Sequence, residues 1–364
     1  MDPRVHEVFV YYLQTAQGNP SSIHQEGQQA RGLLTQARRE IANYLGCRSS
    51  EIFFTSGATE GLNIIMRGIF GLNPRGHLIT SSIEHASVYS TAKSLEDAGC
   101  SVTFLNPENS GEINPKALQA ALQPDTRLIA LMAVNNETGV KTDIHAIAAI
   151  AHEAKIPFLV DGVGLMGKAS FEIPDGVSAM CFSGHKFHAP KGCGFCFVRS
   201  NLKLHSVLTG GAQEFGKRSG TENLPAIMAM LEAIHILYKE LPNASTRMEH
   251  LRNKLEQELL DRLQGVTING KDSQRIVNTS NLSFDDVEGE SLLTLLDMAG
   301  IAVSHGSACA SGALEPSRVL LNMGLPREKA SSAIRLSLSR FTNESEIDRT
   351  IEAIYSIVNK LRYR

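Results

Sequence analysis

Short runs of apolar residues recur through the first half of the chain, separated by stretches with helical spacing. Most of these runs do not alternate between apolar and polar positions, which is typical of strands buried on both faces of a largely parallel sheet. The pattern therefore predicts an α/β protein with strands at residues 51–54, 77–80, 101–105, 127–134, 157–160, 179–182 and 194–198.

The segments between these runs have the spacing of amphipathic helices. In residues 143–155 the apolar side chains fall on one face, at Ile144, Ile147, Ala148 and Ala151. The last helix has a similar apolar stripe. It begins with Asn343 three residues before Glu346, which is the spacing of a capping box.

The pattern changes after about residue 241, where a long charged helix at 245–264 leads into a region with fewer apolar runs. A chain of 364 residues is also long for one ordinary compact core. We therefore expect a large domain at residues 1–242 and a smaller C-terminal domain at residues 243–364.

Composition narrows the class of protein. A hydrophobic content of 42% and a charged content of 20% are those of a globular protein. The net charge of −3 argues against nucleic acid or an anionic membrane as the main partner. No apolar run approaches membrane-spanning length, and the residues after Met1 lack the pattern of a signal peptide. Six cysteines in a chain of this length make no disulfide framework, so we expect a cytoplasmic protein with reduced thiols.

The first candidate site follows the predicted strand at 51–54. The run Thr-Ser-Gly-Ala-Thr-Glu (55–60) leads into an apolar helical pattern. A small-residue turn at a helix start presents backbone N–H groups and a helix dipole to an anion. The run lacks the glycine spacing of a P-loop or a dinucleotide site, so a single phosphate is the better prediction. Plain helix capping is the alternative explanation.

Three further residues of chemical interest follow predicted strands. Asp161 ends one strand, and a carboxylate there lies where open α/β sheets bind ligands. Lys186 follows another in Ser-Gly-His-Lys (183–186), where a partly desolvated amine is a candidate nucleophile. His85 lies just past a third. Taken alone, Asp161 is also explained as a turn cap and His85 as a helix start, and Lys186 is better explained as a surface lysine.

Cys309 lies in a run of small residues, 304–312, without bulky apolar neighbours. This indicates an accessible loop thiol or a tight surface turn, and the run alone does not decide between them. Cys193 and Cys196 form a C-x-x-C, but residues three apart on a strand point to opposite faces. We therefore expect both to be structural. The histidines have no H-E-x-x-H or other metal spacing, so we expect no metal site.

The joint pattern is more specific than its parts. A phosphate cradle, an aspartate and a lysine at different strand ends are what pyridoxal 5'-phosphate requires. The chain here resembles the cysteine desulfurases of the NifS/IscS-like group, within the class V aminotransferase family. The resemblance covers nearly the whole chain. It rests on residues 55–60, Glu84-His85, Asn-Asn-Glu-Thr-Gly (135–139), Val160-Asp161, 183–186, Arg-Ser-Gly-Thr (218–221), Ser-Ala-Cys (307–309) and Arg-Leu-Ser-Leu-Ser-Arg-Phe (335–341).

This resemblance implies the fold of pyridoxal-phosphate-dependent transferases (aspartate aminotransferase-like). That fold has a mainly parallel central sheet with helices on both faces and a smaller C-terminal α+β domain. It also implies catalytic roles for three residues. Lys186 would bind the cofactor covalently, His85 would stack on its ring and assist proton transfer, and Cys309 would attack the sulfur of L-cysteine. The products would be L-alanine and a persulfide on Cys309.

The resemblance further implies which residues bind cofactor and substrate. Asp161 would pair with the ring nitrogen, and Asn136 would lie near the ring hydroxyl and the substrate carboxylate. Arg335 would bind that carboxylate through both oxygens. The remaining cofactor-binding residues would be Ala58, Thr59, Ser183, His185 and, from the other subunit of a homodimer, Thr221. A sulfur-acceptor protein, either an iron–sulfur scaffold or a sulfur carrier, would receive the sulfur.

Two features depart from the family pattern. The chain begins at Met1-Asp2-Pro3, where the family's opening strand and its Asp-x-x-Ala-Thr-Thr-like segment would already have ended. Gly164 occupies the position of a glutamine that binds the ring oxygen of the cofactor. These departures leave two alternatives to a desulfurase. One is a lyase acting on selenocysteine or cysteine sulfinate on the same scaffold, and the other is an impaired, non-catalytic paralogue.

Overall fold

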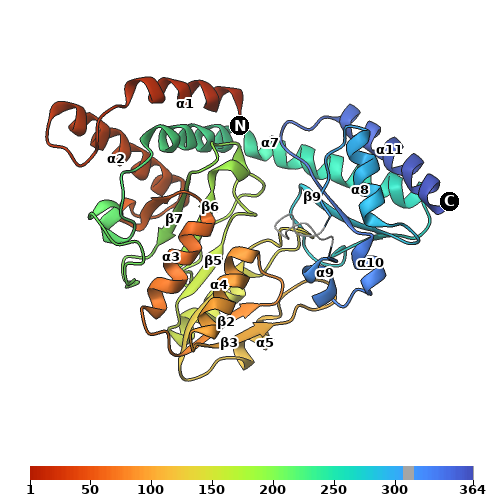
Figure 1. The fold of residues 1–364 in the computed structure, drawn as a ribbon, viewed down its shortest axis with the longest axis horizontal. Coiled ribbons are helices and arrows are strands. Elements are labelled where there is room, and N and C mark those ends of the chain that lie inside the picture. Colours follow the sequence, from red (N-terminus) through yellow and green to blue (C-terminus); the bar gives the residue numbers. More distant parts are fainter. Residues whose placement is uncertain (306–314, 364) are drawn as a thin grey trace.

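The computed structural model describes residues 1–305 and 315–363, which form an α/β protein (Figure 1). Within these residues, seven strands make the main sheet in the order β1-β7-β6-β5-β4-β2-β3. All strands run in one direction except β7, which is antiparallel to both of its neighbours. The prediction of a mainly parallel sheet is confirmed, and each apolar run is a strand. The strands are β1 (Ile52–Thr55), β2 (His77–Ser81), β3 (Ser101–Leu105), β4 (Thr126–Met132), β5 (Phe158–Asp161), β6 (Ala179–Ser183) and β7 (Gly194–Val198).

Helices cover both faces of this sheet, which is why most of its strand residues are apolar. One face packs against α3 (Ala58–Phe70) and α4 (Ala86–Asp97). The other packs against α2 (Gln25–Leu45), α6 (Ile144–Ala154) and the first half of α7 (Leu224–Arg262). Successive residues of a strand point to the two faces alternately. In β7, Phe195 packs in the core with α2, α6 and α7, and Cys196 packs in the core with α3 and α4. The N-terminal helix α1 (Pro3–Thr15) lies along α7, and the short α5 (Pro115–Ala120) lies near α6.

The C-terminal part has its own antiparallel sheet and hydrophobic core. Its strands are β8 (Val266–Ile268), β9 (Thr279–Phe284) and β10 (Ile334–Ser337), and its helices are α8 (Gly289–Met298), α9 (Arg318–Asn322), α10 (Arg327–Ser331) and α11 (Glu344–Arg362). The capping box predicted at Asn343 and Glu346 is present at the start of α11.

The helix expected at 245–264 is the second half of α7, a single helix of 39 residues. It begins against the main sheet, runs through Pro242 and ends against the small sheet (Figure 1). A division of the chain at residue 242 therefore falls inside a continuous helix, and this boundary stays a prediction.

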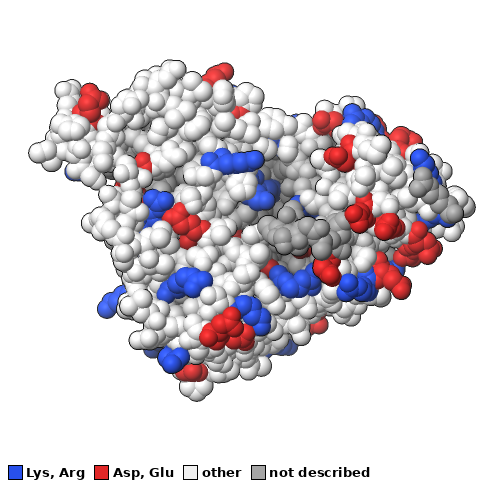
Figure 2. All heavy atoms as spheres, in the orientation of Figure 1, with Lys and Arg blue, Asp and Glu red and all other residues white. Residues whose placement is uncertain are grey.

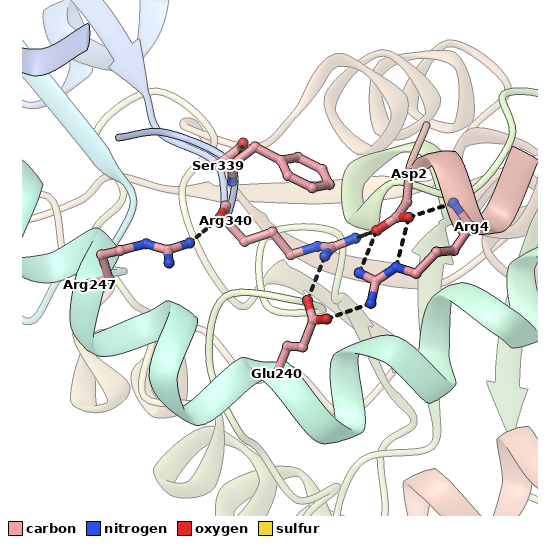
Figure 3. Close-up of polar contacts among 7 residues, drawn as sticks. Asp2, Arg4, Glu240, Arg247, Ser339 and Arg340 are labelled. Carbon is pink, nitrogen blue, oxygen red and sulfur yellow. Dashed lines mark hydrogen bonds and ion pairs between the residues drawn. The ribbon is translucent and has the colours of Figure 1, made fainter. Parts of the chain in front are cut away.

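A cluster of four charged side chains joins the N-terminus to this helix and to the C-terminal part (Figure 3). Asp2 accepts hydrogen bonds from the guanidiniums of both Arg4 and Arg340. Glu240 of α7 accepts from the same two arginines, at 2.6 and 2.7 Å. Each carboxylate thus bridges both guanidiniums, and the four charges are compensated within the cluster.

Charges of both signs are interspersed on the face shown in Figure 2. Acidic side chains gather over the C-terminal part, at the right of that view. Among the described residues, no helix is long and apolar enough to span a bilayer.

Candidate active site

One edge of the main sheet collects the predicted site residues. Strands β1, β2, β4, β5 and β6 run in parallel, so their carboxyl ends lie at the same edge, where open α/β sheets bind ligands. The chain leaves these ends at Ala58, His85, Asn136, Asp161 and Lys186. In Figure 1 the C-terminal part, with β9 and α9, lies beside this edge.

Asp161 is the last residue of β5 and lies between Met132 of β4 and Cys181 of β6. Its Oδ1 accepts a hydrogen bond from the Val163 N–H at 3.1 Å. The carboxyl group is buried, and burial raises its pKa, while the hydrogen bond from Val163, the charge of Lys186 and that of His85 when it is protonated act in the opposite direction. A buried carboxylate of this kind requires a cationic partner.

His85 is the N-cap residue of α4. Its Nδ1 accepts from the Ser87 N–H at 3.1 Å, so in the neutral ring the proton is on Nε2. Burial lowers the pKa of His85, the charges of Lys186 and Arg318 lower it further, and Asp161 opposes them. The ring is therefore a neutral imidazole at neutral pH, electrostatically linked to Asp161 and Lys186.

The predicted phosphate cradle is at the start of α3. The Ala58 N–H donates to Oγ of Ser183, the last residue of β6, at 2.9 Å, so the two turns meet. A Cβ built on Gly57 would lie 3.4 Å from the same Oγ, and Gly57 has a φ of 157° that favours glycine. Thr59 and His185 are exposed beside these turns, where a ligand can contact them.

Thr221 is exposed, like Thr59 and His185, on the loop that follows the turn Gln213–Gly216. That loop is tied to α3 because the Arg218 Nε donates to Oε1 of Glu60 at 2.6 Å. The role expected for Thr221 in the phosphate site of the other subunit stays a prediction.

Lys186 lies in the short helical turn Gly184–Phe187 after β6, and it is exposed. The backbone of this turn is held by Lys168, whose Nζ donates to the Lys186 carbonyl oxygen at 2.9 Å and to that of Met166 at 3.2 Å. Burial, with a smaller contribution from the charge of Lys186, lowers the pKa of Lys168 to about 7. Sequence reasoning missed Lys168, because it becomes a neighbour of Lys186 only through the fold.

Arg335 reaches this edge from β10 of the small sheet. Its Nη1 donates to the Asn136 carbonyl oxygen at 2.7 Å, and its Nη2 donates to the Ser304 Oγ at 3.2 Å. The Oδ1 of Asn136 is buried and has no hydrogen-bond partner among the described residues. The structure thus brings together both predicted substrate-binding residues. Cys309 lies outside the described residues.

Arg318 is a further residue that sequence reasoning missed. From α9 its guanidinium donates to the carbonyl oxygens of Ser82 and Glu84, the second at 2.6 Å, and it lies 3.9 Å from the centre of the Tyr89 ring. These partners flank His85 in the chain. Nothing in the sequence around Arg318 indicates that it contacts the residues before His85, so only the fold identifies this contact.

Gly164 is closely packed. A Cβ at this position would lie 2.7 Å from Cβ of Val134 and 3.1 Å from the Val134 carbonyl oxygen. The position therefore accepts no side chain unless the backbone shifts, and it supplies no side-chain hydrogen bond to a ligand.

The remaining cysteines agree with a structural role. Cys193 and Cys196 lie in different cores on opposite faces of the sheet, as predicted from their spacing. Cys196 instead faces Cys181 on the neighbouring strand, with the sulfur atoms 3.2 Å apart. Burial raises the pKa of both Cys181 and Cys193, the latter to about 12, so these thiols are unreactive. No group of three potential metal ligands occurs among the described residues.

The site residues fit pyridoxal 5'-phosphate. The buried carboxyl of Asp161 would hold the protonated ring nitrogen, which is the cationic partner that it requires. The unpartnered Oδ1 of Asn136 leaves that amide available to the ring hydroxyl or the substrate. Ala58 and Ser183 would hold the phosphate at the start of α3.

Comparison with known proteins gives a consistent result. The aminotransferase class-V family model matches residues 1–350. "Cysteine desulfurase 2" of Trichormus variabilis is 40% identical over 364 residues, which cover 100% of this chain and 91% of that protein. A solved NifS-like protein superposes with a TM-score of 0.92 at 34% identity, covering 99% of this chain and 96% of its own.

A second solved structure, described as SspA in complex with cysteine, has a TM-score of 0.83 at 32% identity and covers 94% of this chain and 97% of its own. These matches extend over nearly the full length of the chain. The chain belongs to the aminotransferase class-V family.

Proposed function

We propose that the protein is a pyridoxal-phosphate-dependent cysteine desulfurase, which converts L-cysteine to L-alanine and takes up the sulfur as a persulfide on Cys309. The observation that carries this proposal is the placement of Asp161 at the end of β5, of Lys186 in the turn after β6 and of His85 at the start of α4, all at one edge of the sheet. The names of the relatives, cysteine desulfurases at about 40% identity, support the same activity.

Each residue has a defined task at this edge. When bound, pyridoxal phosphate withdraws electrons from the Cα of the substrate amino acid. Lys186 would hold the cofactor and, once released, would accept the Cα proton at its amine. Asp161 would keep the ring nitrogen protonated, and the neutral His85 would pack on the ring and exchange protons through its Nε2.

Arg335 and Asn136 would orient the substrate. The guanidinium of Arg335 offers parallel donors that match the two oxygens of a carboxylate. Two of its contacts, the Asn136 carbonyl oxygen and the Ser304 hydroxyl, are neutral acceptors. A carboxylate forms stronger hydrogen bonds with a guanidinium than either of these groups, so it would compete with them effectively.

The sulfur step transfers one sulfur atom from the substrate to Cys309. The Cys309 thiolate attacks the substrate sulfur, and an S–S bond forms as the Cβ–S bond breaks. The electron pair of the broken bond stays with Cβ, which takes up a proton to become the methyl group of alanine. The sulfur is therefore oxidised to the persulfide level while the carbon is reduced. Thiolate is the reactive form, so Cys309 must be deprotonated.

The replacement Cys309→Ala tests the proposal. We expect it to abolish the formation of alanine from cysteine in the presence of pyridoxal phosphate, while Cys47→Ala, the replacement of a thiol at the end of α2, retains it. Alanine can be measured by chromatography and the persulfide by mass spectrometry of the Cys309 peptide. A Cys309→Ala variant with full sulfide release would indicate instead a lyase that needs no protein thiol.

The partners belong to the same proposal. We propose that the protein works as a homodimer, in which Thr221 of each chain completes the phosphate site of the other, and that it passes the persulfide sulfur to an iron–sulfur scaffold or a sulfur carrier. The exposure of Thr221 supports the first point. A cytoplasmic location suits a thiol that must stay reduced between turnovers.

A further inference from the structure

Three contacts place Arg318 around the residue that we assign to the cofactor ring. The Nη2 of Arg318 donates to the carbonyl oxygen of Glu84, the residue before His85, at 2.6 Å. Its guanidinium carbon lies 3.9 Å from the ring centre of Tyr89, four residues after His85. Since residues four apart in a helix lie on the same side, Arg318 contacts α4 on the side where His85 begins the helix.

The third contact extends this hold to the preceding turn. The Nη1 of Arg318 donates to the Ser82 carbonyl oxygen, and the Asn322 Nδ2, one helical turn further along α9, donates to the same oxygen at 3.1 Å. Two carbonyl oxygens of this turn, those of Ser82 and Glu84, are therefore bound by the C-terminal part of the chain. A guanidinium suits this task because it presents several donors in a rigid plane.

We propose that Arg318 is a positioning residue for His85: it clamps the turn Ser82–His85 against α9 and so fixes the imidazole relative to Asp161 and Lys186. The inference rests on the role that we propose for His85. The C-terminal part of the chain carries both Arg335 and α9. Through Arg318 of α9, the position of this part would therefore also determine the position of His85.

Electrostatics give this clamp a measurable signature. The charged groups in reach of His85 are Asp161 of β5, Lys186 of the turn after β6 and Arg318 of α9, and Glu84 precedes it in the chain. Burial and the charge of Arg318 both lower the pKa of His85. Loss of the guanidinium would admit water and remove a positive charge. Both changes move the pKa of His85 upward.

The test compares Arg318→Ala with Arg318→Lys, and Arg327→Ala serves as the control because Arg327 is an exposed arginine of the neighbouring α10. In the full chain without cofactor, the His85 ring is followed by NMR across a pH titration and assigned from a His85→Gln sample. We expect Arg318→Ala to raise the pKa of His85, Arg318→Lys to keep most of the charge effect, and Arg327→Ala to leave the titration unchanged.

With cofactor bound, we expect Arg318→Ala to lower kcat about tenfold or more, because a displacement of about 1 Å in a catalytic group has effects of this size or greater. The KM for cysteine should change less, since Arg335 is intact. Arg318→Lys should recover only part of kcat, because an ammonium cannot span two carbonyl oxygens as a guanidinium does. Tyr89→Leu should lower kcat in the same direction, and its effect should not add fully to that of Arg318→Ala.

A lower melting temperature in Arg318→Ala with an unchanged His85 titration and unchanged kcat would show that Arg318 is merely structural and would overturn the inference. If Arg318→Ala does not fold, Arg318→Lys and Tyr89→Leu carry the same comparison. The NMR readout needs no activity, so it separates the two proposals. If Arg318→Ala shifts the His85 titration but the wild type has no desulfurase activity, the clamp is upheld and the proposed function is refuted. If the wild type is active and the titration of Arg318→Ala is unchanged, the function is upheld and the clamp is refuted.

Discussion

The carboxyl group of Glu84 lies in the interior of the protein, directly before His85 in the chain. Its Oε1 accepts a hydrogen bond from the Ser81 hydroxyl at 2.6 Å, and its Oε2 is buried without a partner among the described residues. Burial raises the pKa of Glu84 from 4.5 to about 8, and the charge of Asp161 adds to the rise. Glu84 is therefore a neutral acid at neutral pH, and it adds no second negative charge beside Asp161.

This ionisation makes the stability of the protein depend on pH. The folded state holds the Glu84 proton more tightly than the unfolded state, so the contribution is full below about pH 4.5 and is lost as the pH rises through 8. The variant Glu84→Gln is neutral at every pH. We expect the free energy of unfolding of the wild type to fall relative to that of this variant between pH 5 and 8, by up to about 4 kcal/mol.

Thermal unfolding at a series of pH values measures the difference. Glu112→Gln, a change at an exposed carboxylate, is the control and should follow the wild type. Parallel curves for Glu84→Gln and the wild type across this range would contradict the assignment of a neutral Glu84.

A buried ion pair joins α2, β1 and the turn Gln213–Gly216. Glu214, in the turn Gln213–Gly216, accepts from both terminal nitrogens of Arg38 of α2 at 2.7 Å. Its Oε2 also accepts the Phe54 N–H of β1 at 2.8 Å. The same turn leads into the loop of Thr221, so the pair anchors that loop to α2 and β1.

The variant Glu214→Ala removes three acceptor contacts and leaves the Arg38 guanidinium buried beside an apolar side chain. Breaking a buried pair from one side is strongly destabilising, so we expect a loss of about 3–5 kcal/mol. Equilibrium urea unfolding measures it, with Glu153→Ala on the exposed face of α6 as the control. An unfolding midpoint equal to that of the wild type would show that water replaces the lost carboxylate.

The N-terminal end of the chain and its C-terminal part are connected by an ion-pair cluster as well as by α7. Asp2 and Arg340 are both buried, and they meet beside Glu240 in the middle of α7 (Figure 3). Burial alone would raise the pKa of Asp2, but the guanidiniums of Arg4 and Arg340 outweigh it and hold that pKa well below its usual range. Arg340 follows Arg335 by five residues, so this cluster also fixes the segment that delivers the proposed substrate-binding arginine.

A double-mutant cycle of Asp2→Asn and Arg340→Met isolates this link. Each single change should destabilise the protein, and the double change should cost less than their sum, with a coupling of about 0.5–3 kcal/mol. The contribution of Asp2 is present above its unfolded pKa of 3.8 and is lost as the pH falls toward its lower folded value. The coupling should therefore fade in acid. Strictly additive changes at neutral pH would show that the two side chains act independently.

The order of strands and helices was predictable from the chain, because burial on both faces imposes apolar runs and burial on one face imposes a helical stripe. The runs at β5 and β6 located Asp161 and Lys186 at strand ends, and the capping signal at Asn343 located the start of α11. The continuity of α7 was not predictable in the same way. Pro242 and the change of pattern around it suggest a boundary, but both halves of the helix are buried by different sheets.

The sequence itself determined which chemical groups follow the strands, because a residue's identity and its position after a buried strand are both local properties. Asp161, Lys186, Ala58 and His85 therefore followed from the chain. Only the tertiary structure decided which groups surround them. Arg318 reaches the turn of His85 from 234 residues away in sequence, and Lys168 holds the backbone of Lys186 across a connection between strands. Such contacts depend on how sheets and helices pack, and no periodicity along the chain encodes them.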